Sequence, residues 1–169
     1  MRNGLLALMV LAACSRPAPP PRDPSQADLQ LRRVSVRSYS GGELRVVTTA
    51  DVLDVFREAG TPGDLVAHDA GVLVVRDGTR ITAPLVTGNF VAGRLEAEGG
   101  VRLTGRDGVV ARSPRVTFDR SEGAGGVASS DAGVWVERPG ASLEARAFVM
   151  DLAAERAAFE DVSSDFSPR

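Results

Sequence analysis

The sequence predicts an elongated all-β protein, and an internal repeat is the main reason. Residues 77–87 read DGTRITAPLVT and residues 107–117 read DGVVARSPRVT, so five identities recur 30 positions apart. Further apolar strand starts follow Gly71, Gly100 and Gly133 at similar spacing. A unit of this size cannot bury an apolar face alone, so it must stack on copies of itself. We therefore expect a stack of two-stranded repeats of about 30 residues rather than a compact globule with one cleft.

Short strands separated by Gly, Pro, Asp and Asn are expected from Leu29 onward. Alternating Leu29, Leu31, Val34 and Val36 begin the first. The others are expected at 44–48, 65–67, 72–75, 80–86, 89–97, 101–104, 109–118, 134–137, 143–150 and 158–162. Segments 49–60 and 148–158 have helical propensity, the first with a Thr cap and a Gly stop, but the repeat register favours strands in both.

Period-two alternation gives the repeats one apolar face. Arg102, Arg115 and Glu144 fall on the opposite face. The same apolar positions are also what the core of an ordinary two-layer sandwich requires. The apolar set comprises Val72, Val74, Val101, Leu103, Val116, Phe118, Val134, Val136, Phe148 and Met150.

The N-terminus has the pattern of a lipoprotein signal. Arg2 precedes an apolar run that is too short to span a bilayer and that ends in Leu-Ala-Ala-Cys at Cys14, the only cysteine. We expect residues 1–13 to be removed and Cys14 to carry acyl chains that anchor the protein to a membrane. The alternative is a plain signal peptide in which Cys14 is incidental.

A Pro-rich linker is expected at 14–28, before a single folded domain at 29–165. Five of the ten prolines lie at 17–24, and a polyproline II segment at about 3.1 Å per residue would place the domain up to roughly 40 Å from the membrane. No second cysteine is present for a disulfide. The stability of the domain must therefore come from burial and from the hydrogen bonds of the sheet.

Composition and motifs favour no catalytic chemistry. The net charge of −2 gives no nucleic-acid footprint. All 20 basic residues are arginine, which fits either phosphate recognition or a GC-rich genome. His68 precedes Asp69, but no nucleophile motif accompanies them, so we expect no enzyme and no catalytic residue.

Repeated aspartates are better explained by turns and strand ends than by metal binding. They are Asp77, Asp107, Asp119 and Asp151. We expect no metal site and no cofactor. Trp135 and Tyr39 are left without a role.

The repeats resemble a known family. The run LEAEGGVRLTGRDGVVARSPRVTFD at 95–119 and the looser GVWVERPGASLEARAFVMD at 133–151 are similar to the repeat of periplasmic lipopolysaccharide-export proteins of the LptC, LptA and OstA type. The resemblance covers about residues 31–162. It implies a folded-over β-jellyroll, two antiparallel sheets facing each other, whose apolar groove carries the acyl chains of lipopolysaccharide. The ten apolar positions above would line that groove.

This resemblance also implies partners and a location. A lipid-anchored, single-domain member would be a periplasmic adaptor on the inner membrane, receiving lipopolysaccharide from ABC transporter subunits and passing it to a soluble LptA-like bridge protein. Ser15 after Cys14 leaves the outer membrane open as the anchoring site. The C-terminal edge strand, with Phe159 and Asp161, is where we expect the bridge protein to add a strand, followed only by a polar tail.

Two other classes of function remain compatible with the sequence. One is a structural envelope lipoprotein whose repeats form a scaffold without carrying lipid. The other is a periplasmic enzyme or sugar-binding β-sandwich. A bound lipid would distinguish the transport hypothesis from both.

Overall fold

The structure is a computed structural model that describes most of the chain after the linker. Residues 1–22, Cys14 among them, lie outside the described residues, as do Asp77 and Asp107. The described residues are 23, 26–58, 61–75, 78–89, 91–105, 108–120, 126–151, 154 and 156–166. Within them no helix combines the length and the hydropathy that crossing a membrane would need.

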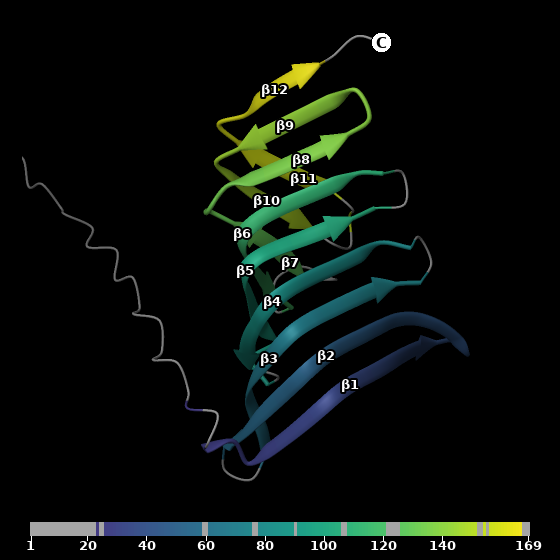
Figure 1. Cartoon of the computed structure of the whole chain (residues 1–169), viewed down its shortest axis with the longest axis vertical. Coiled ribbons are helices and arrows are strands. Elements are labelled where there is room, and N and C mark those ends of the chain that lie inside the picture. Colours follow the sequence, from purple (N-terminus) through teal and green to yellow (C-terminus); the bar gives the residue numbers. More distant parts are fainter. Residues whose placement is uncertain are drawn as a thin grey trace, which may run out of the picture.

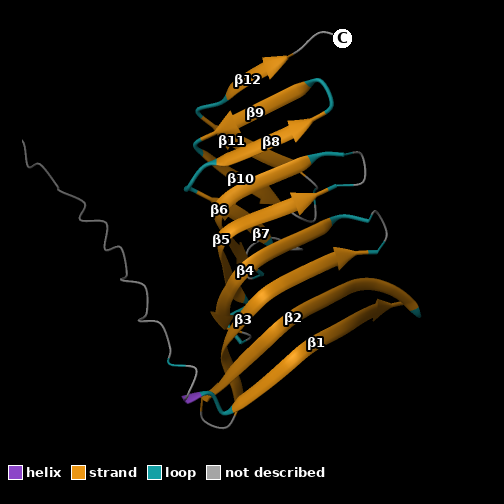
Figure 2. Ribbon diagram, in the orientation of Figure 1, coloured by secondary structure: helices purple, strands orange, loops and turns teal. Residues whose placement is uncertain are grey.

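The described chain forms an all-β, elongated, jellyroll-like fold, as predicted (Figure 2). All of its strands belong to one antiparallel sheet. The strands are β1 (Leu29–Ser40), β2 (Glu43–Glu58), β3 (Thr61–Val74), β4 (Arg80–Asn89), β5 (Arg94–Thr104), β6 (Val110–Asp119), β7 (Val127–Ser130), β8 (Val134–Arg138), β9 (Ala141–Ala145), β10 (Ala147–Asp151), β11 (Arg156–Glu160) and β12 (Ser163–Phe166).

The sheet folds over on itself into two layers (Figure 1). The two layers separate at β6, which pairs with two different strands. The N-terminal part of β6 pairs with β8, whereas its C-terminal part pairs with β7. From there, β8, β9 and β12 continue one layer, and β7, β10 and β11 continue the other. We call these layers the first arm and the second arm. Strands β1–β6 each run through both arms.

Each long strand bends where its ladder is interrupted. Arg33 in β1, Asp69 in β3 and Asp161 between β11 and β12 have positive φ values of 53°, 50° and 51°. Pro84 lies at the bend of β4, at a break in the ladder register, where its missing N–H costs no sheet hydrogen bond. Gly99 in β5, with φ 83°, packs beside it, since an added Cβ would lie 3.3 Å from the Pro84 ring.

This bend explains the sequence repeat. Pro84 and Pro114 occupy equivalent bends in β4 and β6. Gly78 and Gly108 both have φ 74° in the turns that precede these strands, a conformation that favours glycine. Each repeat of about 30 residues is therefore a hairpin of two bent strands.

Many of the buried apolar residues lie near the bend and are small, and a second buried group, Phe56, Leu65 and Val55, lies farther along the second arm. Ala50 of the first arm clusters with Leu65 and Ala67 of the second, and Val34 and Leu53 pack against this cluster. Ala83 and Ala145 are also buried. Small side chains at the bend let the two arms approach each other closely there.

Several strand predictions are confirmed and others are wrong. Segment 49–58 is strand within β2 despite its helical propensity; residues 59 and 60 lie outside the described residues. Segment 148–158 is also strand rather than helix where it is described, but it belongs to two strands, the end of β10 and the start of β11. The single strand expected at 89–97 is wrong, because the Asn89 side chain accepts a hydrogen bond from the Ala92 N–H and Gly93 has φ 69°, which makes a turn.

Other boundaries also differ from expectation. Segments 65–67 and 72–75 belong largely to one strand, β3, and the expected strand at 143–150 is split at Arg146 into β9 and β10. Strand β7 was missed because it is only four residues long. The tail expected to be merely polar contains β12, which pairs with β9. Its sequence, Ser-Ser-Asp-Phe, has no apolar alternation to reveal it.

Candidate functional site

The face that each arm turns toward the other, which we call the inner face, carries one continuous row of mostly apolar residues per arm. In the first arm the row crosses β1 to β6 and then β8, β9 and β12. The ladder partners are Val36, Thr48, Val72, Ile81, Leu103, Ala111, Val136, Leu143 and Ser164. Cross-strand neighbours of this kind stack side chain on side chain.

The second arm has a matching inner row that crosses from β1 to β11. Apart from one glycine, every member has an apolar side chain. The ladder partners are Leu29, Val55, Leu65, Gly88, Leu95, Phe118, Ala128, Met150 and Ala157. An apolar strip therefore follows the stack on both sides of the space between the arms.

The ten apolar positions singled out in the sequence all fall on this inner face. Val101 and Val134, near the bend, are only 6% and 4% exposed. The remaining eight are intermediate in exposure. The Phe148 ring lies 6.4 Å from the Phe159 ring, centroid to centroid, which extends the strip to β11, the last strand of the second arm. Away from the bend, much of the inner face is thus apolar but incompletely covered, whereas Val55 and Leu65 of the second-arm row are buried.

The opposite, outer face of the first arm is polar. One of its rows runs Ser35, Thr49, Gly71, Thr82, Arg102, Arg112, Trp135, Glu144 and Ser163. Trp135 lies on this face close to Gly133, where an added Cβ would be 3.4 Å from its ring. The contrast between the faces is what a folded sheet with one water-facing side requires.

Two glycines that sequence reasoning passed over shape the inner face. An added Cβ at Gly126 would lie 2.7 Å from Cε2 of Phe118, so the Phe118 ring rests directly against this glycine. At Gly88 an added Cβ would lie 2.5 Å from Cδ2 of Leu95. Both contacts are closer than real Cβ atoms tolerate, so a glycine is needed at each position for the large neighbour to lie as it does.

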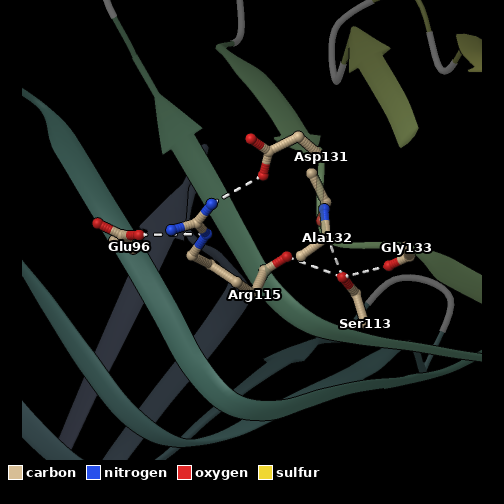
Figure 3. Close-up of polar contacts among 7 residues, drawn as sticks. Glu96, Ser113, Arg115, Asp131, Ala132 and Gly133 are labelled. Carbon is tan, nitrogen blue, oxygen red and sulfur yellow. Dashed lines mark hydrogen bonds and ion pairs between the residues drawn. The ribbon is translucent and has the colours of Figure 1, made fainter. Parts of the chain in front are cut away.

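A polar network holds the bend where the sheet branches (Figure 3). Ser113 and Ser130, both buried, lie with their Oγ atoms 3.0 Å apart. Ser113 Oγ is also 2.8 Å from the carbonyl oxygens of Arg115 and Gly133, and Ser130 Oγ accepts the Ala132 N–H at 3.1 Å. Ser113 has one hydroxyl hydrogen, so the two carbonyls must share or alternate it.

Charges on the outer surface tie neighbouring strands together. Arg115 donates to Asp131 at 2.8 Å and lies 3.5 Å from Glu96 (Figure 3). The hydrogen bond from Arg115, and then its charge, hold the pKa of Asp131 below its usual value. Likewise, hydrogen bonding to Asp161 and the nearby carboxylates raise the pKa of Arg146. These exposed pairs fix local geometry more than they stabilise the fold.

Both ends of the sheet are open in the described structure. β1 pairs only with β2, while β11 and β12 pair only with β10 and β9. Exposed large apolar side chains gather at these edges, including Leu31 and Val36 in β1 and Val162 and Phe166 in or beside β12. Such edges are templates for strand addition.

The two residues proposed for the C-terminal edge have different positions. Phe159 lies in the edge strand β11. Asp161 lies at the bend after it, with a positive φ of 51°, and accepts a hydrogen bond from Arg146 Nε at 2.7 Å. Phe159 is therefore an edge-strand residue, whereas Asp161 is a bend residue beside the edge.

His68 lies in β3 next to the bend, paired across the ladder with Val52 and Leu85. Among the described residues, no group of three or more His, Cys, Asp and Glu side chains is placed to hold a metal ion.

Comparison with known proteins does not assign a family: no protein-family model and no curated protein matches this chain. The features of the described chain that bear on function are the inner face, the outer face and the open edges. Of these, the inner face is the one that is mostly apolar across the stack.

Proposed function

We propose that this protein is a periplasmic, membrane-anchored adaptor of lipopolysaccharide export. It holds the acyl chains of lipopolysaccharide between its two arms and passes them along the stack. The observation that carries the proposal is the pair of inner rows, which are mostly apolar and cross the sheet from one edge to the other. The resemblance of the repeats to the LptC, LptA and OstA type supports the same function.

The shape of the inner face suits acyl chains. Small residues such as Ala50 and Ala83 close the bend, and larger ones such as Leu103 and Phe118 lie farther out on the arms. A site so arranged offers apolar contact along its length without enclosing the ligand. Covering apolar surface contributes about 25 cal/mol per Å², so chains of a dozen or more methylenes would gain substantially from lying there.

The anchor and the two open edges together define the direction of transport, from the β1 end to the β11–β12 end. Cys14, at the N-terminal side of the domain, would carry the lipid anchor and keep the β1 end near the membrane and its ABC transporter. Strands β11 and β12 form the end of the stack opposite to β1 (Figure 1). In this proposal an LptA-like bridge protein receives lipid at that open end by adding a strand.

A scaffold lipoprotein is the second candidate, because the open edges would serve assembly equally well. Native mass spectrometry of the full chain, extracted from its own envelope in mild detergent, separates the two. The transport function predicts lipopolysaccharide bound to the parent and to an Arg102→Asp variant, but not to a Leu103→Asp variant. These neighbours lie on opposite faces of β5.

The result opposed to transport is equally definite. If the parent carries no lipopolysaccharide while its fold by circular dichroism is intact, or if Leu103→Asp and Arg102→Asp retain equal amounts, the inner face is not the carrier. A Leu103→Ala variant guards against loss of binding through unfolding. It introduces no charge, so it should keep most of the bound lipid if the fold survives.

A further inference from the structure

Trp135, the only tryptophan of the chain, is exposed on the polar outer face of the first arm. It is 41% exposed, although burying an indole is strongly favourable. The end of its ring lies over Gly133, where an added Cβ would be 3.4 Å from Cη2. The ring thus takes no part in the inner face, and its exposure calls for a different explanation.

Beside this ring, the outer face is hollowed over β8, β9 and β12, which lie side by side (Figure 1). The hollow has a volume of about 250 Å³, and the residues that line it all belong to the first arm. Its outer-face residues come from two neighbouring cross-strand rows. They are Trp135, Glu144 and Ser163 in one row and Glu137, Ser142 and Asp165 in the next.

The hollow carries more negative charge than its surroundings neutralise. Arg112 Nη1 lies 3.3 Å from Glu137 Oε1, so one of the three carboxylates is paired. Within the described part of the chain, no ion pair engages Glu144 or Asp165. Two uncompensated carboxylates next to an exposed indole favour a ligand that is cationic and also presents an apolar surface.

The Pro-rich linker contains a segment of that chemistry. Residues 16–22, which lie outside the described residues, read RPAPPPR, with an arginine at each end and no acidic residue. Such a proline content favours polyproline II, with three residues per turn and a rise of about 3.1 Å. Arg16, Pro19 and Arg22 then share one edge of the segment, at intervals of about 9 Å.

This spacing matches the dimensions of the hollow. β12 lies two ladder steps from β8, about 10 Å, with β9 between them. With Pro19 against the Trp135 ring, an arginine therefore reaches Glu144 or Asp165 in either chain direction. Polyproline II leaves its carbonyl oxygens free, and serine hydroxyls at the hollow can donate to them. Aromatic grooves bind Pro-rich segments in this manner.

We propose that the hollow beside Trp135 binds residues 16–22 of a neighbouring copy of this chain. The segment of the same copy falls short. Nine residues separate Pro19 from Asp28, about 28 Å in polyproline II. Trp135 lies six ladder steps from β1, about 29 Å, and on the outer face of the other arm from Leu29.

A neighbour held on the same membrane has no such limit on its reach. The contact would gather copies on the membrane while leaving the inner face and the strand edges uncovered. It uses only the linker sequence and the outer face, so the inference holds whether or not lipid is carried.

The fluorescence of Trp135 tests the site, because the emission of the full chain comes from this one indole. The receiver is the full chain with Arg16→Ser, Pro19→Ser and Arg22→Ser, which removes the competing linker. A synthetic peptide of residues 15–24 should shift its emission to shorter wavelength in a saturable manner. A peptide with the same three substitutions should bind at least about fivefold more weakly.

Charge variants of the receiver locate the peptide. Glu144→Gln should weaken binding of the unchanged peptide about threefold or more, whereas Glu43→Gln, the same charge change in β2, should leave it unaltered. Both side chains are exposed, and circular dichroism checks that each variant stays folded. No shift with the unchanged peptide, equal binding of both peptides, or equal effects of the two variants would overturn the site.

Photo-crosslinking in cells tests which copy supplies the segment. An epitope-tagged full chain carries a photoreactive residue at the exposed Ser142 and is co-expressed with the untagged chain. It should form crosslinked dimers that mass spectrometry maps to residues 15–24 of the untagged copy. The three linker substitutions in the untagged copy should lower the dimer fraction at least about fivefold. Crosslinks only to the linker of the same chain, or only to another protein, a sugar or a lipid, would overturn the proposal.

Discussion

The side chains of Ser113 and Ser130 hydrogen-bond to each other, Oγ to Oγ at 3.0 Å, where the sheet divides into its two arms. Ser113 comes from the middle of β6, and Ser130 is the last residue of β7. Their hydroxyls satisfy backbone groups that the interrupted ladder leaves without strand partners. A polar pair thus holds a bend whose surroundings are apolar.

Replacing Ser130 with Ala should therefore destabilise the fold by about 1–3 kcal/mol, because Ser113 and the Ala132 N–H lose a partner in a buried setting. Ser129→Ala, one residue earlier and less buried, is the control and should change stability by less than about 0.5 kcal/mol. Equilibrium urea unfolding followed by circular dichroism measures both. Equal losses would show that the pair has no special role.

Gly126→Ala should cost more stability than Gly41→Ala. Both glycines have positive φ, 91° and 61°, so each substitution carries backbone strain of about 1–2 kcal/mol. Only at Gly126 would the new Cβ also press on the Phe118 ring, while nothing lies within 4 Å at Gly41. Urea unfolding of the two variants should therefore differ by at least about 1 kcal/mol. Identical midpoints and slopes would mean that the Phe118 ring moves aside freely.

Acid titration should reveal the Arg115–Asp131 pair. Because Arg115 lowers the folded-state pKa of Asp131, the pair contributes stability above the unfolded pKa of about 3.8 and loses it as pH falls through the lower folded value. Arg115→Met should return the Asp131 pKa toward its ordinary value, whereas Arg102→Met should leave it unchanged. NMR titration of the carboxyl groups measures the Asp131 pKa directly. If the Asp131 pKa in Arg115→Met were the same as in the parent protein, Arg115 would not be the cause of its lowering.

The lipid anchor is tested by Cys14→Ala. This change removes the acyl attachment point and should move the protein from the membrane fraction to the soluble fraction without loss of fold, because the Pro-rich linker separates anchor from domain. Fractionation with a high-salt wash, followed by immunoblotting, measures the distribution. A variant that remains in the membrane fraction would rule out the lipobox assignment.

The fold class could be predicted because the repeat and the period-two alternation place the same apolar residues on one side of the sheet. Val72, Leu103 and Val136 were grouped by alternation alone, and the structure places them in one cross-strand row. Pro84 and Pro114 marked the repeat, although their position at the bend became apparent only from the structure. Local patterns show which side a residue faces, but they do not show where a strand changes direction.

Edges and glycine contacts were harder to predict for physical reasons. β12 is short and mostly polar. It forms a strand because its backbone pairs with β9, not because its sequence favours a strand. Gly126 is required by the distant Phe118 ring, a contact that no local pattern encodes. The sequence pattern thus predicted the apolar face but not how it ends.

Site-specific photo-crosslinking in intact cells is the most direct test of lipid carriage between the arms. A photoreactive residue at Leu103 or Phe118, on the inner face, should label lipopolysaccharide while export is active. The same residue at the neighbouring positions Arg102 and Thr117, on the outer face, should label it at least about tenfold less, because strand neighbours point to opposite faces. Absence of lipid labelling at both inner positions in cells with active export, or equal labelling on both faces, would contradict the account.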